Sequence, residues 1–136
     1  MLKRIATVSL VLVFVVAGAA YAATQTTGTK VTLHSTSRGK VLATSTGRTL
    51  YLDTADPKNK STCTGSCASI WPPLKTKGKP VAGTGVKKSL LSQTTTHVVT
   101  YNGHALYTYT GDTKAGQATG EGSNGFYVVK ASGKKG

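Results

Sequence analysis

The sequence lacks several features that would each indicate a familiar class of protein. Beyond residue 22, no stretch shows the apolar periodicity of an amphipathic helix, which argues against a groove-reading helix for nucleic acid. Only two cysteines occur, Cys63 and Cys67. Their spacing, with no following histidine, matches neither the Cys-x-x-Cys redox motif nor c-type haem attachment. No nucleophile–base pattern is visible, so we expect no enzymatic activity, no catalytic residues and no cofactor.

Acidic residues are also scarce. Four Asp and Glu stand against 17 Lys and Arg, which gives a formal charge of +13 at pH 7. Without Lys3 and Arg4, the remaining 15 basic residues and four acids leave a charge of +11. In an exported protein, such a surface favours anionic partners such as cell-wall polymers or lipid headgroups. The alternative is solvated charge that only keeps the protein soluble.

Residues 1–22 have the pattern of a secretory signal peptide. A basic N-terminus precedes an apolar run over residues 5–16, and the Ala-Tyr-Ala of residues 20–22 offers small residues at both cleavage-determining positions. An uncleaved membrane anchor is the alternative, although the run is shorter than the ~20 residues that a span needs. No cysteine follows the run to accept a lipid. We therefore expect a periplasmic or extracellular protein with one domain over residues 23–136.

A 15-residue stretch occurs twice. Residues 42–56 (LATSTGRTLYLDTAD) and 98–112 (VVTYNGHALYTYTGD) align without a gap at an offset of 56, which also carries Trp71 onto Tyr127. Such a repeat indicates two copies of one supersecondary unit, each too small to bury its apolar face alone. We place repeat one at about residues 31–74 and repeat two at about residues 87–130.

The local chemistry of the repeat predicts β structure. Asn102-Gly103 lies between runs rich in Thr, Val and Tyr, which is typical of a type I′ hairpin. Pairing Tyr101 with His104 places Val99 opposite Leu106 and Val98 opposite Tyr107. Side chains then alternate between two faces, with Val98, Thr100, Ala105, Tyr107 and Tyr109 on one and His97, Val99, Tyr101, His104, Leu106 and Thr108 on the other.

The first copy should turn at Thr46-Gly47 in the same way. Upstream, residues 31–35 and 40–44 flank a further turn, so each copy reads as a three-strand antiparallel meander. We predict an all-β domain in which two homologous meanders pack as a pseudo-twofold sandwich or barrel-like unit. A propeller would need at least four blades.

The motifs together resemble those of the bacterial secreted-repeat family, also described as predicted lipoproteins with a conserved Yx(F/W/Y)xxD motif. The resemblance rests on Tyr107-x-Tyr109-x-x-Asp112, on CTGSCASIWPPL at residues 63–74, and on the Tyr-Asn-Gly hairpin with its closing aromatic strand. It covers roughly residues 41–130 and implies an exported envelope protein of unestablished biochemical function. Two departures stand out: Asp53 replaces the aromatic of the first motif, and the lipid-bearing cysteine of many relatives is missing.

The acids and tyrosines of the motifs are the candidate binding surface. Asp56 and Asp112 close strands, where a carboxylate can accept hydrogen bonds from backbone N–H groups two or three residues on. Alternatively, the acids frame a shared polar site with repeat-related tyrosines. One face of an antiparallel sheet usually meets water, so exposed tyrosines could stack on the sugar rings of a wall polymer, whereas core packing is the alternative. The candidates are Tyr51, Asp56, Tyr107, Tyr109 and Asp112, with Tyr101 as a further exposed ring.

Other motifs predict structural roles. Export places Cys63 and Cys67 in an oxidising compartment, so we expect a disulfide that pins the loop leading to Trp71. His97 lies about 13 Å along the strand from the partner of His104, at ~3.3 Å per residue, so the two cannot share a metal ion. The G-x-G-x-x-G of residues 120–125 precedes a strand, which is the wrong context for a dinucleotide site.

We therefore expect a non-enzymatic cell-envelope or extracellular module that binds an anionic wall polymer or a protein partner. We expect no nucleic acid partner, and membrane contact only through an uncleaved N-terminal segment. The alternative is a metal-handling or redox accessory protein of the envelope that uses Cys63, Cys67 and one or more of His34, His97 and His104.

Overall fold

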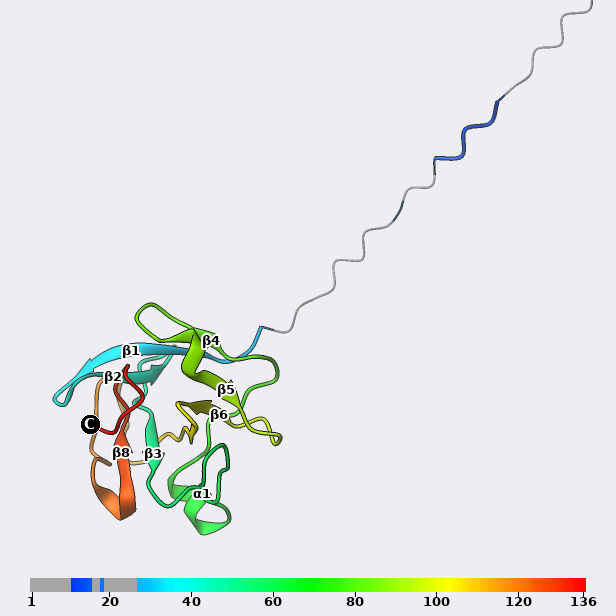
Figure 1. Ribbon diagram of the computed structural model, residues 1–136. Helices are drawn as coiled ribbons and strands as arrows, with labels where there is room; N and C mark the ends of the chain where they lie inside the picture. The colour runs from blue at the N-terminus through cyan, green and yellow to red at the C-terminus, as the bar shows by residue number, and fades with distance from the viewer. Residues whose placement is uncertain (1–10, 16–17, 19–26) are drawn as a thin grey trace, which may run out of the picture.

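The computed structural model describes residues 11–15, 18 and 27–136 (Figure 1). The predicted signal peptide and its cleavage site therefore lie largely outside the described residues. Within the described ranges, no helix combines the length and the apolar character that a bilayer crossing requires.

The domain is built from short strands, as predicted for an all-β protein. Three small sheets have the strand orders β2-β1-β4, β3-β8 and β5-β6-β7. No sheet closes into a barrel within the part of the chain that the structure describes. The bounds are β1 Lys30–Thr36, β2 Gly39–Thr44, β3 Tyr51–Asp53, β4 Val81–Ala82, β5 Leu91–Gln93, β6 Val99–Tyr101, β7 His104–Ala105 and β8 Phe126–Val128.

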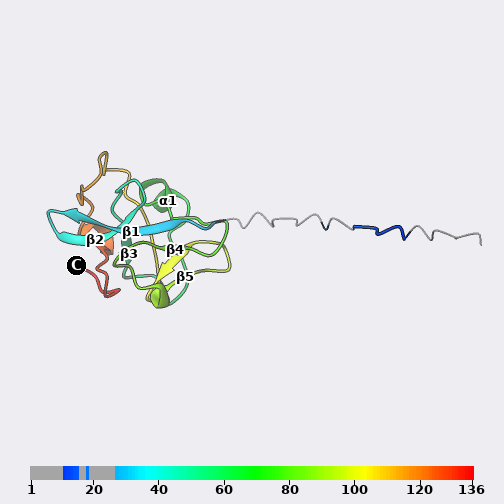
Figure 2. The same ribbon diagram turned by 90° about the horizontal axis from the view of Figure 1, so that it is seen from above.

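The helical elements are single turns that connect strands. They are the α-helix α1 (Ser66–Ile70) and the 3₁₀ turns η1 (Lys88–Leu90) and η2 (Ser123–Gly125). Seen from above, α1 and β5 lie toward opposite sides of the line formed by β1 and β2 (Figure 2). The glycine-rich segment of residues 120–125 leads directly into β8, as the sequence predicted.

The second-copy hairpin has the predicted turn. Tyr101 pairs with His104, and Asn102 and Gly103 both have positive φ, +50° and +80°, as a type I′ turn requires. Leu106 N–H donates to Val99 O at 2.9 Å, which extends the predicted register. The further pairing of Val98 with Tyr107 is wrong, because the two strands separate there: Tyr107 pairs with Tyr51, and Val98 pairs with Lys75.

The first-copy hairpin differs by one residue from the prediction. Thr44 N–H donates to Arg48 O at 2.8 Å, and Ala43 faces Thr49, so the loop contains three residues instead of the two expected at Thr46-Gly47. Gly47 has φ +85°, the left-handed position that ends a three-residue hairpin loop. The extra loop residue breaks the strict offset of 56 between the copies.

The closing strand of each repeat pairs with the other repeat. In repeat one, Leu74 N–H donates to Leu106 O at 2.8 Å. In repeat two, β8 pairs antiparallel with β3, with Val128 opposite Tyr51 (Figure 1). The two meanders therefore interlock by exchanging strands, and each completes its pairing only with the other.

Two apolar clusters fill the interior. One contains Val99, Tyr101 and Leu106, and the other contains Val98, Ala105 and Tyr107, so the predicted alternation of faces is confirmed. Because each face packs against its own cluster, the central residues of the second hairpin are buried on both faces. The first cluster is completed mainly by Val31, Leu42, Leu50, Leu52, Val86 and Val129, and the second by Val41, Cys63, Trp71, Phe126, Val128 and Tyr51.

Candidate functional site

A symmetric backbone pair joins the two motif strands. Tyr51 N–H donates to Tyr107 O at 2.8 Å, and Tyr107 N–H donates to Tyr51 O at 2.9 Å. These residues are equivalent in the repeat, so the pair of bonds lies on the pseudo-twofold axis. The two tyrosine side chains project into the same apolar cluster.

The side-chain hydrogen bonds cross between the repeats. Tyr51 donates its hydroxyl to Asp112 Oδ2 at 2.6 Å, and Tyr107 donates its hydroxyl to Asp56 Oδ2 at 2.5 Å. Each motif tyrosine thus binds the motif aspartate of the other copy. The structure brings four of the five candidate residues together in two crossed pairs, although it does not unite them in one open site.

The second oxygen of each aspartate binds a threonine. Asp56 Oδ1 accepts from Thr62 N–H at 2.8 Å and from its hydroxyl at 2.6 Å. Asp112 Oδ1 accepts from Thr119 N–H at 2.9 Å and from its hydroxyl at 2.6 Å. The expected loop-closing role is present, but the donors lie six and seven residues on instead of two or three. Each aspartate therefore ties the start of a loop to a point six or seven residues further along it.

Burial determines the protonation of the two tyrosines in the crossed pairs. Desolvation, reinforced by the bonded aspartate, raises the pKa of Tyr51 and of Tyr107 well above the usual range for a phenol. Both hydroxyls therefore stay protonated at neutral pH and serve as hydrogen-bond donors. The two hydrogen bonds thus link the repeats through buried phenol donors.

The expected exposure of the tyrosines is wrong at three positions. Tyr51, Tyr101 and Tyr107 are all 0% exposed, so none of these rings can stack on a sugar. Asp112, at 1%, is equally closed to ligands. Among the candidate residues, only Asp56 and Tyr109 retain partly exposed side chains. The rings are covered because Tyr101 packs into one apolar cluster and Tyr51 and Tyr107 pack into the other.

Three aromatic rings stack beside the crossed pairs. Trp71 lies parallel to Phe126, with centroids 4.0 Å apart and planes 3° apart, and Tyr109 stacks on Trp71 with centroids at 4.4 Å. Tyr51 meets Trp71 edge-on, as Tyr107 meets Phe126. The partner of Trp71 in the repeat is therefore Phe126, not the Tyr127 that the fixed offset selects.

Asp53 occupies the position that Tyr109 holds in the other repeat. It is only 7% exposed, and burial raises the pKa of its carboxyl. Its Oδ1 accepts one backbone bond, from Ala55 N–H at 2.9 Å. The departure from the family pattern thus places a poorly solvated acid at the end of the aromatic stack.

The predicted disulfide is present. Cys63 and Cys67 are bonded, and Trp71 N–H donates to Cys67 O at 2.8 Å, so the bridge fixes the turn that delivers the tryptophan to the core. Both cysteines pack in the aromatic cluster. In the part of the chain that the structure describes, no group of three His, Cys, Asp or Glu residues is arranged to hold a metal ion.

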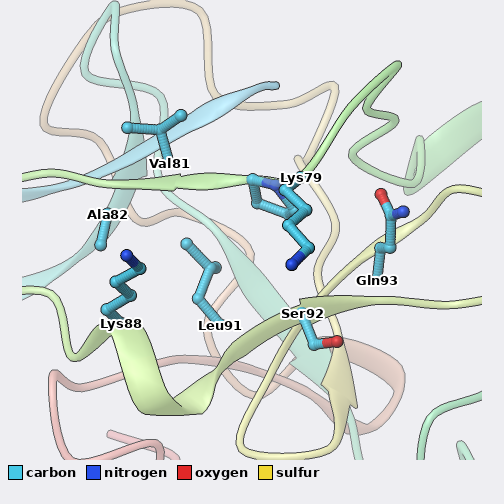
Figure 3. A pocket seen from close by; sticks show the side chains of 8 residues that line it. Lys79, Val81, Ala82, Lys88, Leu91, Ser92 and Gln93 are labelled. Atoms are coloured by element: carbon cyan, nitrogen blue, oxygen red, sulfur yellow. The ribbon is translucent and has the colours of Figure 1, made fainter. Parts of the chain in front are cut away.

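A pocket of about 690 Å³ lies between β4 and β5, away from the motifs (Figure 3). The repeated stretch did not indicate it, because residues 79–82 lie between the two repeats and residues 88–93 precede the aligned segment at 98–112. The only signal for it in the sequence is a pair of lysine clusters on either side of Val81 and Ala82. Its lining residues are Lys79, Pro80, Val81, Ala82, Lys88, Leu91, Ser92 and Gln93.

The comparison with known families agrees with the motifs. A family model described as a secreted repeat of unknown function matches residues 32–75 and 93–129. The two matched segments contain the two copies of the repeat, and the family description confirms the predicted export to the envelope or the extracellular space. No curated protein and no solved structure matches the chain.

Proposed function

This chain belongs to the family of secreted repeats of unknown function, and we propose that it is a non-enzymatic envelope module whose basic surface binds an anionic wall polymer. The observation that carries the proposal is the exposure of the basic side chains in the described part of the chain. All 15 Lys and Arg side chains of residues 27–136 belong to exposed residues. The charge of these side chains therefore faces the solvent, and the acids accept hydrogen bonds from other groups.

The acids are used to hold the fold together. Asp56 and Asp112 bind tyrosines and threonines, Asp53 binds a backbone N–H, and Glu121 Oε2 accepts from Val128 N–H at 2.6 Å. Arg48 and Lys75, the cationic side chains that donate hydrogen bonds in the described part, both donate to backbone carbonyls. A polyanion could therefore bind the lysines without displacing an internal carboxylate.

The burial of the tyrosines changes the character of the proposed binding. Stacking on sugar rings would require exposed aromatic faces, and these are largely used in the core. Charge is the remaining means of attraction, and exposed charges act over about 10 Å at 0.1 M salt and about 3 Å at 1 M. The proposal therefore predicts little dependence on sugar identity and strong dependence on ionic strength.

Cosedimentation with purified cell wall and with polyglutamate tests the proposal. We expect binding at about 20 mM salt and release at about 500 mM, because salt screens exposed charges. Replacing Lys58, Lys60, Lys130 and Lys134 by Gln should weaken binding, whereas Arg at the same positions should preserve it. Binding that ignores salt, or equal effects of Gln and Arg, would contradict the proposal.

The metal-handling or redox alternative has less support. Both thiols of the chain are used in the Cys63–Cys67 disulfide, which leaves no thiolate ligand in this structure. A protein partner needs a more specific site than distributed charge, and the pocket between β4 and β5 offers one.

A further inference from the structure

The pocket between β4 and β5 combines three kinds of recognition group. Lys79 and Lys88 lie on either side of Leu91, and Gln93 lies beyond Lys79 (Figure 3). Val81, Ala82 and Pro80 continue the apolar lining on the β4 side. At about 690 Å³, the pocket has the volume of a small-molecule site, where apolar walls and a few polar groups orient a ligand.

Gln93 supplies the third group. Its amide oxygen is buried and has no hydrogen-bond partner in the described part of the chain. A buried acceptor without a donor costs free energy, about 1–3 kcal/mol. A ligand that carries an N–H group next to its acid would satisfy it.

The strands beside the pocket also have free backbone groups. β5 is the last strand of its sheet. The backbone bonds that join it to β6 involve even-numbered residues of this segment. Asn102 N–H donates to Leu90 O at 2.9 Å, and Thr94 N–H donates to Val98 O at 2.8 Å. In an antiparallel ladder the intervening residues point their N–H and C=O groups away from the partner strand. Leu91 and Gln93 therefore direct these groups to the open edge. β4 likewise ends its own sheet.

We propose that this pocket binds the carboxyl-terminal residue of a peptide whose last side chain is apolar. Lys79, which lies between Leu91 and Gln93 in Figure 3, attracts the terminal carboxylate, and Lys88 adds to the positive potential of the pocket. The Leu91 and Ala82 wall receives the apolar side chain, and Gln93 accepts the N–H of the last peptide bond. The free edge of β5 is available for the preceding residues, in the manner of strand addition. The proposal does not depend on polymer binding, because the surface lysines and the pocket can be tested separately.

Titration of the exported protein with two peptides tests the proposal. Acetyl-Ala-Ala-Leu with a free carboxylate should shift the amide resonances of Val81, Ala82 and Leu91 in a heteronuclear NMR spectrum. The same peptide with a carboxamide end should bind at least about tenfold more weakly, because it lacks the charge that the lysines attract. Equal binding of the acid and the amide would overturn the proposal.

Decanoate is the second probe, since it supplies a carboxylate and an apolar body without an N–H group. We expect it to bind more weakly than the peptide acid. If it binds as tightly, recognition through Gln93 is wrong, and the pocket takes simple acidic amphiphiles. Resonance shifts spread over all lysines instead of the pocket would equally contradict the proposal.

Two variants separate the pocket from the rest of the surface. Lys79→Gln with Lys88→Gln should abolish peptide binding, whereas Lys60→Gln with Lys114→Gln removes the same charge elsewhere and should leave it unchanged. Leu91→Trp enlarges a side chain that points from β5 toward β4 (Figure 3) and keeps every charge, so it should block the peptide while polyglutamate still binds. Peptide binding that survives Leu91→Trp in a protein with unchanged circular dichroism would exclude the site.

Discussion

Each repeat contributes one tyrosine and one aspartate to the two crossed hydrogen bonds, but the two bonds have different surroundings. Tyr51 meets Asp112 in a fully buried setting, where the carboxyl-bearing residue is 1% exposed. Tyr107 meets Asp56 at the edge of the core, where the aspartate is half-buried and Ser61 Oγ lies 2.6 Å from the phenol. Similar bonds can therefore contribute different amounts to stability.

The differences between the repeats lie away from their shared axis. The disulfide occurs only in repeat one, and the second aromatic of the motif occurs only in repeat two, where Tyr109 stacks on Trp71. The backbone pair and the crossed bonds, in contrast, are nearly identical in length. Residues that face the other repeat are constrained by exchanged strands, whereas the outer residues are free to differ.

Removing one of the two aspartates should have the largest effect on stability, and the size of that effect should differ between the repeats. Asp112→Ala should lower the free energy of unfolding by about 3 kcal/mol, because it leaves the hydroxyl of Tyr51 buried without an acceptor. Asp56→Ala should cost only about 1 kcal/mol, since Ser61 Oγ, 2.6 Å from the Tyr107 hydroxyl, can still accept its hydrogen bond and Thr62 is exposed to water. Urea denaturation of both variants measures the difference. Equal losses would mean that burial does not distinguish the two pairs.

A smaller effect should appear in alkaline solution. The pKa of each buried tyrosine is raised in the folded state, so above about pH 10 the unfolded chain loses its phenolic protons first. Stability should then fall by about 1.4 kcal/mol per pH unit for each tyrosine. Tyr51→Phe and Tyr107→Phe should each remove half of this decline, and the double variant should remove it all.

Urea denaturation at pH 9, 10 and 11 provides the measurement. Deprotonation of lysines changes the surface charge in every variant, so the difference from the parent protein isolates the phenols. A decline of the same slope in the double variant would show that neither tyrosine is held protonated by the fold. A change in only one single variant would show that the two pairs are not equivalent.

Local chemistry predicted the local structure of this protein. Asn102-Gly103 specified its turn because both positions need positive φ, and the period of two specified which side chains share a face. The exchange of closing strands could not be predicted, because alternation fixes the face of a residue and not its partner strand. Alternation therefore assigned Tyr101 and Tyr107 to the correct faces, but it did not show that apolar clusters formed by both repeats bury these faces. The one-residue slip of the first hairpin likewise depends on packing beyond the turn.

The smallest effect concerns Asp53, the residue that breaks the symmetry of the aromatic stack. Burial raises the pKa of this carboxyl, so ionisation is easier in the unfolded chain, and stability is lost as the pH rises through the acidic range. Asp53→Asn keeps an oxygen that can accept from Ala55 N–H and removes the charge. It should raise the melting temperature at pH 7 and leave it nearly unchanged at pH 3, where the parent carboxyl is already protonated in both states. Thermal melts at the two pH values decide the point: an equal gain at both would trace the effect to packing, and a loss at pH 7 would mean that the ionised carboxylate supports the first repeat as the tyrosine supports the second.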